Sequence, residues 1–395
     1  MNKSTFFTGQ PIFTQLLRFI PRNVVSRIAL DNKSDRYCKR FNTYEHLVTM
    51  LYAILNNCHS LREVITGMLA AEQRLSHLAV RYHPRRSTLS DANNRRSAKV
   101  FEDIYYTLFN RYAGFLSDSR RGIYIFDSTT ISLFQEILRT GGMAPANGKR
   151  KGGIKVHTLL RSDQDVPCMI RFSQAAASDS PFLKHVHLPA GSIILFDRGY
   201  HDLSGFQQLT DSKVTWITRR RQPFKITVLH DIAVKSSQKD IISDQKVSVG
   251  LKAGHIVQAR LITYRNSLSG ECFQFLTNNF RMLPSTIADL YRKRWQIEIL
   301  FKRMKQNYPL RYFLGDTANA IQIQIWCALI ADFIINLIKK TIAHKWSFSN
   351  LCAMVRLHLM TYINLKVFLK APEKALLKMI THHKSDNFNL LLFKT

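Results

Sequence analysis

Between Ser192 and Asp197 the sequence is an almost unbroken run of apolar residues that ends on an acid. A run of this kind, without polar alternation, is typical of a strand that is buried on both faces, as in the parallel sheets of α/β proteins. A second β-rich run, Gly122–Asp127, has the same form and also ends on an aspartate. Further strand candidates lie at 154–160 and 168–172. The sequence therefore predicts a mixed α/β domain.

Residues 1–115 have the apolar spacing of a helical N-terminal domain. Ser60 and Glu63 have the spacing of a capping box, in which the serine accepts from the amide three residues on and the glutamate reaches back. A later helix leads into a basic stretch that contains Arg95 and Arg96. Short helices that end in a basic helix suit a helix-turn-helix that binds DNA ends, with these two arginines as candidate contacts. An ordinary helical bundle with a solvated basic face fits the pattern equally well.

Strand signals crowd together after the second acid and continue until helix returns near Ser285. We therefore assign residues 206–284 to a β-rich insertion within an α/β core formed by residues 120–205 and 285–345. Helical patterns follow, and residues 346–395 form a C-terminal helical segment. The most apolar stretch of the chain contains two glutamines and an aspartate, which favours a buried helix over a membrane span.

The charge balance points to a polyanionic partner. The chain has 57 lysines and arginines against 27 acids, a formal net charge of +30 and a pI near 10.1. Nucleic acid is the leading candidate, and an anionic membrane surface or a merely basic fold are the alternatives. We expect no secretory signal in the first thirteen residues. The six cysteines form no CxxC pair, which argues against a zinc site and fits a reducing cytoplasm.

The two strand-ending acids, Asp127 and Asp197, are candidate metal ligands. A carboxylate at the end of a buried strand is held rigidly, and hard oxygen ligands in fixed positions are what Mg²⁺ or Mn²⁺ requires. An aspartate after a strand is also a common turn former. The presence of two such acids favours a site.

A third acid, Glu298, lies in a stronger pattern. The segment from Tyr291 to Lys305 predicts one continuous helix. At about 100° per residue, Tyr291, Arg294, Glu298 and Lys305 fall in a polar stripe about 60° wide, beside an apolar face that can pack on a sheet. An ion pair between Arg294 and Glu298 on the surface would account for only two of these four residues.

Together these four residues form a Y-x2-R-x3-E-x6-K signature, by which the chain resembles the DDE transposases of the IS-four insertion-sequence family. Asp127-Ser-Thr and Asp197-Arg-Gly-Tyr200 resemble the first-acid and second-acid motifs of that family. The resemblance implies a ribonuclease-H-like core, in which Asp127, Asp197 and Glu298 bind two Mg²⁺ or Mn²⁺ ions.

The same resemblance implies cut-and-paste transposition of an insertion sequence by DNA cleavage and strand transfer, through a hairpin at the transposon end. The implied partners are double-stranded DNA with terminal inverted repeats, target DNA and a second copy of the chain in a paired-end complex. The expected place of action is the bacterial cytoplasm, at the nucleoid, with no membrane partner.

The resemblance also implies that Tyr291, Arg294 and Lys305 contact the DNA backbone. The family places an aromatic residue in the last strand of the insertion, where it holds a flipped base. Here that residue is Phe273, for which a core-facing position is an equally good explanation. Trp216 is a weaker candidate.

Other basic residues are plausible DNA contacts or simply parts of solvated faces. Lys155 and His157 lie on the strand after the first acid, where strand alternation alone would also place them. Arg219–Arg221 and Lys149–Lys151 are short charge runs. His185 and His187 alternate along the chain but have no cysteine or further histidine nearby, so a zinc site is not expected there.

Two other functions share part of this pattern. A regulator that only binds DNA needs base and phosphate contacts but has no use for clustered carboxylates. A metal-dependent nuclease uses the same acids but does not join a 3′-hydroxyl to a new target.

Overall fold

The computed structural model describes residues 9–117, 122–132, 153–220, 224–234, 238, 240–250, 256–342, 346–370 and 372. The chain forms two compact units. One, called here the helical unit, contains residues 1–111 and 304–395. The other, the sheet unit, contains residues 112–303. This division differs from the predicted domains, because residues 304–345 group with the N-terminal helices and not with the α/β core.

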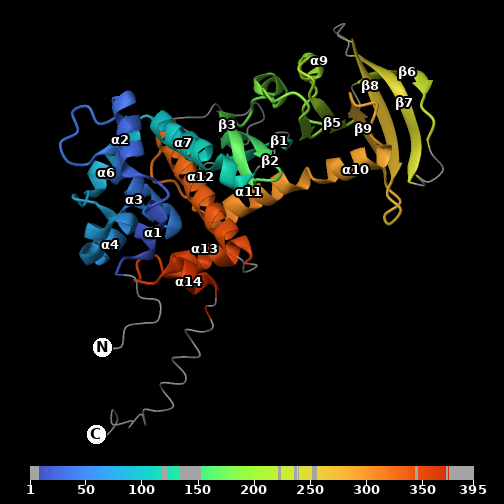
Figure 1. The fold of residues 1–395 in the computed structure, drawn as a ribbon. Coiled ribbons are helices and arrows are strands. Elements are labelled where there is room, and N and C mark those ends of the chain that lie inside the picture. Colours follow the sequence, from blue (N-terminus) through green and yellow to red (C-terminus); the bar gives the residue numbers. More distant parts are fainter. Residues whose placement is uncertain are drawn as a thin grey trace, which may run out of the picture. The chain divides into compact units, whose positions relative to one another are not determined.

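Helices make up the described part of the helical unit (Figure 1). From the N-terminus they are α1 (Ile12–Leu17), α2 (Arg22–Asp31), α3 (Thr43–Leu55), α4 (Leu61–Ala70), α5 (Glu72–Leu75), the short η1 (Ser76–Leu78), α6 (Arg86–Arg95) and α7 (Ala98–Leu116). After the sheet unit the chain adds α12 (Ala318–Thr341), α13 (Phe348–Leu357) and α14 (Leu365–Lys370).

Side-chain caps explain where two of these helices begin. Asn42 and Glu45 form a reciprocal capping box at the start of α3. At α4 the predicted box is half confirmed: Ser60 accepts from the Glu63 amide, but the Glu63 carboxylate accepts from the amide of His59. Both arrangements satisfy backbone amides that the first turn of a helix leaves without partners.

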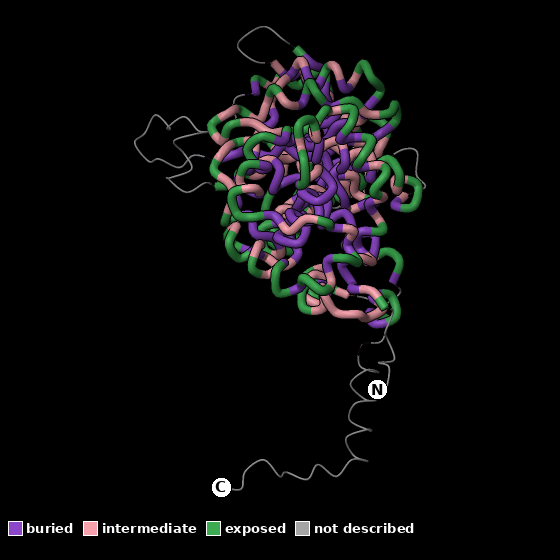
Figure 2. The backbone as a smooth tube through the Cα atoms, turned by 90° about the vertical axis from the view of Figure 1, so that its left-hand side faces the viewer, coloured by how far each residue is buried: buried purple, intermediate pink, exposed green. Residues whose placement is uncertain are grey.

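The helix α12 is the core of the helical unit. By length and composition α12 could cross a membrane, but 94% of its apolar stretch is buried inside the structure. In Figure 2 the buried residues lie toward the inside of the helical unit and the exposed residues toward its outside. The buried polar side chain of Gln324 donates to two backbone carbonyls and accepts from the amide of Leu314, so that its burial is compensated. This arrangement is that of a core helix, as the sequence predicted.

The sheet unit is built on one sheet of nine described strands, in the order β3-β2-β1-β4-β5-β9-β8-β7-β6. The strands are β1 (Ile123–Ser132), β2 (Gly153–Arg161), β3 (Val166–Gln174), β4 (Ile193–Phe196), β5 (Thr215–Arg219), β6 (Lys225–Asp231), β7 (Ile241–Gly250), β8 (Ile256–Arg265) and β9 (Cys272–Thr277). The helices of this unit are η2 (Ser180–His185), α9 (Leu203–Asp211), α10 (Pro284–Arg292) and α11 (Trp295–Asn307), the last of which runs on into the helical unit.

Parallel pairing is confined to β1, β4 and β5, and every other pair of described strands is antiparallel. The middle of the sheet is fully buried, with Ile125, Phe126, Leu195 and Phe196 at 0% exposure. This explains the two apolar runs of the sequence, because strands covered on both faces need apolar side chains at successive positions.

The β-rich insertion extends the same sheet. β9 pairs with β5, and β8, β7 and β6 follow in antiparallel order. Arg260 on β8 forms a buried, bidentate ion pair with Asp244 on β7, at 2.5 and 2.8 Å. The same guanidinium donates to the carbonyls of Asn279 and Met282, which lead into α10. The insertion is therefore fixed to the helix segment that carries Tyr291.

Candidate active site

The two aspartates lie side by side on neighbouring strands, but only Asp197 follows a strand end. β1 continues past Asp127 to Ser132, so the expectation that Asp127 ends its strand is wrong. β1 and β4 are parallel, and their register pairs Phe126 with Phe196. Asp127, still within β1, and Asp197, directly after β4, are the next residues along the chain, so the carboxylates start from adjacent backbone positions. One oxygen of Asp127 accepts from the amide of Ser128 at 2.8 Å, which fixes the rotamer of this side chain.

The segment from Tyr291 to Lys305 is not one helix, which corrects the expectation from the sequence. α10 ends at Arg292 and α11 begins at Trp295. Across this junction the backbone bonds tighten from four-residue to three-residue spacing, as in the bonds from Arg294 to Tyr291 and from Ile297 to Arg294. Tyr291 therefore lies on α10, Arg294 in the turn and Glu298 in the first turn of α11.

The apolar face of this segment packs as predicted. Ile297, Leu300 and Met304 are at most 7% exposed, whereas Trp295 and Ile299 on the opposite side are more than half exposed. Because α11 buries this one face, Glu298 lies at the border between buried and exposed residues. Its side chain is 35% exposed.

Arg294 joins the helix segment to the first strand. Its guanidinium lies 3.3 Å from a carboxylate oxygen of Asp127 and 2.5 Å from one of Glu298. The Arg294 side chain is only 16% exposed. One cation thus bridges two of the three predicted ligands, and the distance between strand and helix is set by this contact.

The environment of Asp127 disfavours its charged form. Burial raises the pKa of the Asp127 carboxyl from 3.8 to about 6, the Ser128 amide and Arg294 lower this pKa, and the charges of Asp197 and Glu298 raise it again. The influence of both other acids on this pKa means that all three carboxylates share one electrostatic environment. Such a cluster gains stability from a cation.

Tyr291 reaches the same environment from α10. Its ring is 8% exposed, and its hydroxyl is buried without a hydrogen-bond partner among the described residues. Burial raises the pKa of this phenol, and the charges of Asp197 and Asp127 raise it further. The Arg294 guanidinium lies 5.9 Å from the ring centroid. A buried hydroxyl without a partner costs free energy, which a ligand oxygen at this point would recover.

Carboxylate oxygens are the donor set that Mg²⁺ and Mn²⁺ prefer, and the three acids fit this requirement by their chemistry. Within the described ranges, no three His, Cys, Asp or Glu side chains lie close enough to hold one ion together. Asp127 and Glu298 already hold a cation between them, the guanidinium of Arg294. Positive charge is therefore already accommodated between these two carboxylates.

An aromatic row connects the site to the insertion. Phe273 and Phe275 lie on the same face of β9 with ring centroids 6.4 Å apart, and Phe275 lies 5.1 Å from Tyr291. The guanidinium of Arg219, at the end of β5, lies 4.7 Å from the Phe273 ring centroid. Phe273 is half-buried at the partly exposed end of this row. Trp216, by contrast, is fully buried, packs on Phe206 and donates to Thr210, so it is a core residue.

Lys155 and His157 lie in a network inside the protein. Lys155 donates to the Ala177 carbonyl and pairs with Asp179 at 3.2 Å. The His157 ring is fully buried, stacks on Phe182 and hydrogen-bonds Ser173, and burial lowers its pKa to about 4. Ordinary strand alternation accounts for both positions.

Asp179 is a residue that sequence reasoning missed. It accepts from the hydroxyl of Ser128, whose amide donates to Asp127, and it also faces Lys155 and His157. The chain Asp179–Ser128–Asp127 thus supports the first acid. No local signal marks Asp179, because its partners come from two distant strands.

The remaining candidates lie elsewhere. Arg95 is exposed and pairs with Asp91 at 2.8 Å. Arg96 is 7% exposed and holds Asp35 and the Phe41 carbonyl within the helical unit. Lys305 is exposed in the last turn of α11. His185 and His187 belong to no metal-binding cluster among the described residues. Lys149–Lys151 and Arg221 fall outside the described residues.

Comparisons with known proteins agree with this geometry. The model of the transposase DDE domain matches residues 118–333, more than half of the chain. A domain of unknown function, DUF4372, matches residues 8–81. The chain is 29% identical over 258 residues to the protein y4zB of Sinorhizobium fredii, which is named as a transposase. That match covers 63% of this chain and 70% of the relative.

Two further relatives carry the names of insertion-sequence transposases. A protein of Synechocystis is 24% identical over 64% of this chain and 71% of its own length. One of Geobacillus stearothermophilus is 23% identical over 52% of this chain and about half (54%) of its own length. A solved structure of piggyBac transposase in a synaptic complex with hairpin DNA covers 98% of this chain and 87% of its own, at 12% identity and a TM-score of 0.48.

The domain match spans Asp127, Asp197 and the helix that carries Glu298, so that these residues of the sheet unit all lie within the matched region. This chain is a transposase of the insertion-sequence type and belongs to the DDE transposase family.

Proposed function

We propose that the chain catalyses cut-and-paste transposition of an insertion sequence, as a member of the IS-four family with the Tyr291, Arg294, Glu298 and Lys305 signature. The fold that supports this is the strand order β3-β2-β1-β4-β5, in which only β1, β4 and β5 are parallel. We regard this part of the sheet as a ribonuclease-H-like core. The observation that carries the proposal is the register that aligns Asp127 with Asp197, together with the Arg294 bridge to Glu298.

Asp127, Asp197 and Glu298 are proposed to hold two Mg²⁺ or Mn²⁺ ions. Bound divalent ions at such a site activate a water molecule or a DNA 3′-hydroxyl and stabilise the leaving oxygen. The chain itself contributes rigidity, since Asp127 lies within a strand, Asp197 directly follows one, and Glu298 lies on a helix with a buried face. Asp179, acting through Ser128, is a positioning residue for Asp127.

The DNA backbone is proposed to replace the contacts that Arg294 makes within the site. A guanidinium binds a phosphate through two parallel hydrogen bonds, in the same way as it binds carboxylates. Tyr291 presents beside Arg294 a hydroxyl that has no hydrogen-bond partner among the described residues. Lys305 adds a point charge on the same helix segment. Phe273, with Arg219 over its ring, is the proposed platform for a flipped base.

The other candidate DNA contacts differ in whether their side chains are exposed or held by intramolecular contacts. Arg95 is exposed and remains a candidate contact for DNA ends. Lys155, His157 and Arg96 are committed to intramolecular contacts, and we leave them out of the proposed DNA interface.

The complete reaction is proposed to involve two chains. Two transposon ends must be paired, so we infer a homodimer bound to terminal inverted repeats, which captures target DNA and acts in the bacterial cytoplasm at the nucleoid. A hairpin at the transposon end is the proposed intermediate, because a flipped base accompanies sharply bent DNA.

The proposal is tested by cleavage of linear DNA that carries the inverted repeats of the element, with Mg²⁺ and with EDTA. Asp127→Ala, Asp197→Ala and Glu298→Ala should each abolish cleavage and still bind the ends. Asp289→Ala, an exposed acid on α10 with a side chain 67% exposed, is the matched control and should cleave normally. Cleavage by any of the three variants would remove that residue from the site.

Joining to a target distinguishes a transposase from a nuclease. The cleaved ends, incubated with a supercoiled plasmid and Mg²⁺, should give covalently joined products. Cleavage without any joined product would instead support a nuclease that hydrolyses DNA and does nothing further.

A further inference from the structure

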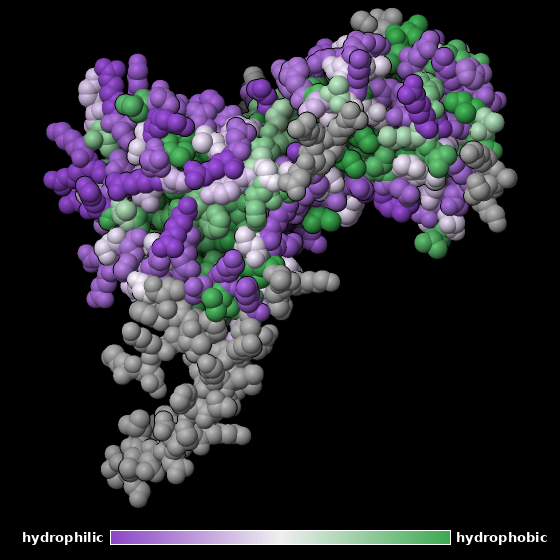
Figure 3. Space-filling view, viewed as in Figure 1, coloured by the Kyte–Doolittle hydropathy of each residue, from purple (hydrophilic) through white to green (hydrophobic). Residues whose placement is uncertain are grey.

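The loop between α2 and α3 presents an unusual set of side chains. This loop, residues 32–42, lies inside the segment that matches the domain of unknown function. It exposes four cations and one aromatic residue, namely Lys33, Arg36, Lys39, Arg40 and Tyr37. In Figure 3, hydrophilic side chains project over α2, α6 and this loop.

The loop is held in one shape by buried partners. Asp35 accepts from the amide and hydroxyl of Thr43, at 2.7 and 2.8 Å, and from Arg96 at 3.2 Å. Arg96 also donates to the carbonyl of Phe41, as does the thiol of Cys38. Arg96 therefore neutralises the one acid within the loop and ties both ends of it to α6. The exposed side chains start from a fixed backbone.

That backbone is strained at two exposed positions. Lys33 and Tyr37 have φ angles of 51° and 62°, in the left-handed region that side chains with a Cβ atom rarely adopt. Tyr37 is 87% exposed, with Arg36 over its ring at 4.9 Å, so its ring contributes little to the core. At Lys33 this conformation ends α2, because the amide of Ser34 donates to the carbonyl of Ala29 in a helix C-cap. Tyr37 follows no helix, and the loop contacts alone hold it in this conformation.

The loop borders a hollow with a strong excess of positive charge. This hollow of about 750 Å³ is lined by the four loop cations and by Arg95 and Arg96, with Asp91 as its one acid among the described residues. Asp91 pairs with Arg95. Within the described part of the chain, no carboxylate lies within salt-bridge distance of Lys33, Arg36, Lys39 or Arg40. Cations that share a surface without counter-charges favour an anionic ligand.

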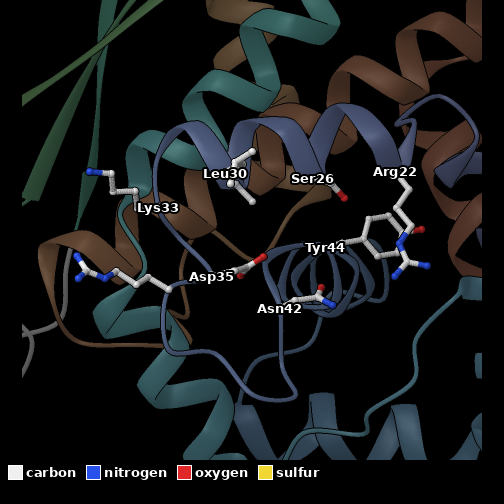
Figure 4. Close-up of a pocket in the computed structure, with 9 residues that line it drawn as sticks. Arg22, Ser26, Leu30, Lys33, Asp35, Asn42 and Tyr44 are labelled. Atoms are coloured by element: carbon white, nitrogen blue, oxygen red, sulfur yellow. The ribbon is translucent and has the colours of Figure 1, made fainter.

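A second hollow continues the surface along α2 (Figure 4). It has a volume of about 490 Å³ and shares Lys33 and Arg36 with the first. At its other end Arg22 lies over the Tyr44 ring, 5.2 Å from the centroid. The cations are thus spread along a loop and two helices and are mostly exposed. An extended polyanion fits this pattern better than one small anion, which would need converging donors in a closed pocket.

We propose that this surface, the α2–α3 loop with Arg22 and Arg95, binds the phosphodiester backbone of double-stranded DNA without regard to sequence. The inference rests on the proposed function only in its choice of DNA as the polyanion. Lys33, Arg36, Lys39 and Arg40 contact phosphates, and Tyr37 packs on or donates to the sugar-phosphate chain. These phosphate contacts are made by the helical unit and are separate from those proposed for the carboxylate site.

The test measures binding of the full-length chain to a random-sequence duplex of about 30 base pairs in EDTA, by fluorescence anisotropy over a range of salt. Replacing all four loop cations by glutamine should reduce the slope of log affinity against log salt by about three to four, since each lost phosphate contact removes about 0.9. The matched control replaces four exposed cations of the same unit, Arg62, Arg356, Lys366 and Lys370, and should change the slope by less than one.

Thermal unfolding of both quadruple variants verifies that the helical unit remains folded. Tyr37→Gly gives a second measurement, because it removes the strained side chain. It should raise the unfolding midpoint and still weaken DNA binding, two effects in opposite directions that a purely structural residue would not show. Equal slopes for the loop and control variants, or unchanged binding by Tyr37→Gly, would overturn the proposal.

Two further measurements distinguish DNA binding by the loop from membrane binding and from effects of the carboxylate site. If the quadruple loop variant loses binding to vesicles that contain phosphatidylglycerol but keeps its DNA binding, the surface belongs to a membrane and the proposal is overturned. Asp289→Ala, at an exposed acid on α10 outside the carboxylate cluster, should bind the random duplex like the unmodified chain. If the acids prove not to be catalytic, the loop result still stands, because this assay contains no metal and measures no cleavage.

Discussion

Replacing Asp127 by asparagine should make the sheet unit more stable at neutral pH and remove its catalytic function. Asparagine resembles the protonated form of aspartate, which the site favours, because burial raises the pKa of Asp127 from 3.8 to about 6. A difference of about two pKa units corresponds to about 3 kcal/mol of free energy that the charged form costs the folded state. The Asp127 side chain is only 19% exposed, so solvent screening reduces this value little.

The pH dependence has a definite sign. The folded-state pKa lies above the unfolded-state value, so the native chain binds more protons between about pH 4 and 6. The contribution of Asp127 to stability is therefore complete below about pH 4 and is lost as the pH rises through about 6. The advantage of Asp127→Asn should grow from about 1 kcal/mol at about pH 4.5 to about 3 kcal/mol at about pH 7.5.

Hydrogen–deuterium exchange in increasing urea, measured on peptides from β1 and β4 in EDTA, gives the stability of this unit apart from the helical unit. Asp211→Asn, at an exposed acid at the end of α9, is the control and should show no such gain. A variant that is less stable than the unmodified chain at the higher pH, or an equal difference at both pH values, would refute the reasoning.

Three other substitutions test separate parts of the site. Arg294→Gln frees two carboxylates and should tighten Mn²⁺ binding, measured in the absence of DNA, by about threefold to tenfold, the equivalent of about 1 kcal/mol. Calorimetry compares this variant with the control Arg292→Gln. Unchanged or weaker Mn²⁺ binding would contradict the bridging role of Arg294. Phe273→Ala should lower the fluorescence change of 2-aminopurine placed at the base that flips, because stacking contributes about 1–3 kcal/mol per base. Phe273→Trp should restore or increase this change. Equal signals from the two variants would exclude Phe273 as the stacking platform for the base. Arg260→Ala leaves Asp244 buried without its partner and should destabilise the insertion by about 3–5 kcal/mol in denaturant titrations, whereas a loss below about 1 kcal/mol would show that the pair is dispensable.

Local patterns were enough to predict that β1 and β4 are strands, although β1 runs past Asp127 to Ser132. The strands that carry Asp127 and Asp197 are buried on both faces, and burial on both faces leaves a continuous apolar run in the sequence. The positions of the insertion strands also follow from alternation and turn residues. The pairing of β9 with β5, which makes one sheet of core and insertion, needed the structure, because strand partners far apart in sequence leave no local signal.

The break between α10 and α11 shows where periodicity fails. The same side chains are compatible with backbone hydrogen bonds of four-residue and of three-residue spacing, so the sequence does not show where one replaces the other. The tighter turn occurs where Arg294 contacts Asp127 and Glu298. Charge patterns fail in a similar way at Arg95 and Arg96. The two are neighbours in sequence, yet one side chain is 80% exposed and the other 7%, because only Arg96 meets Asp35.

The position of β6, β7 and β8 beyond β9 has an evolutionary consequence. These three strands are added at the outer margin of the sheet, and the aromatic row that reaches Tyr291 starts on β9, which is hydrogen-bonded to β5. Arg260 on β8 and Asp244 on β7 hold the segment that leads into α10, so of these three strands only β6 has no part in those contacts. Evolutionary change at the outer edge of the sheet, on β6, is accordingly the least coupled to the aromatic row and to the carboxylates.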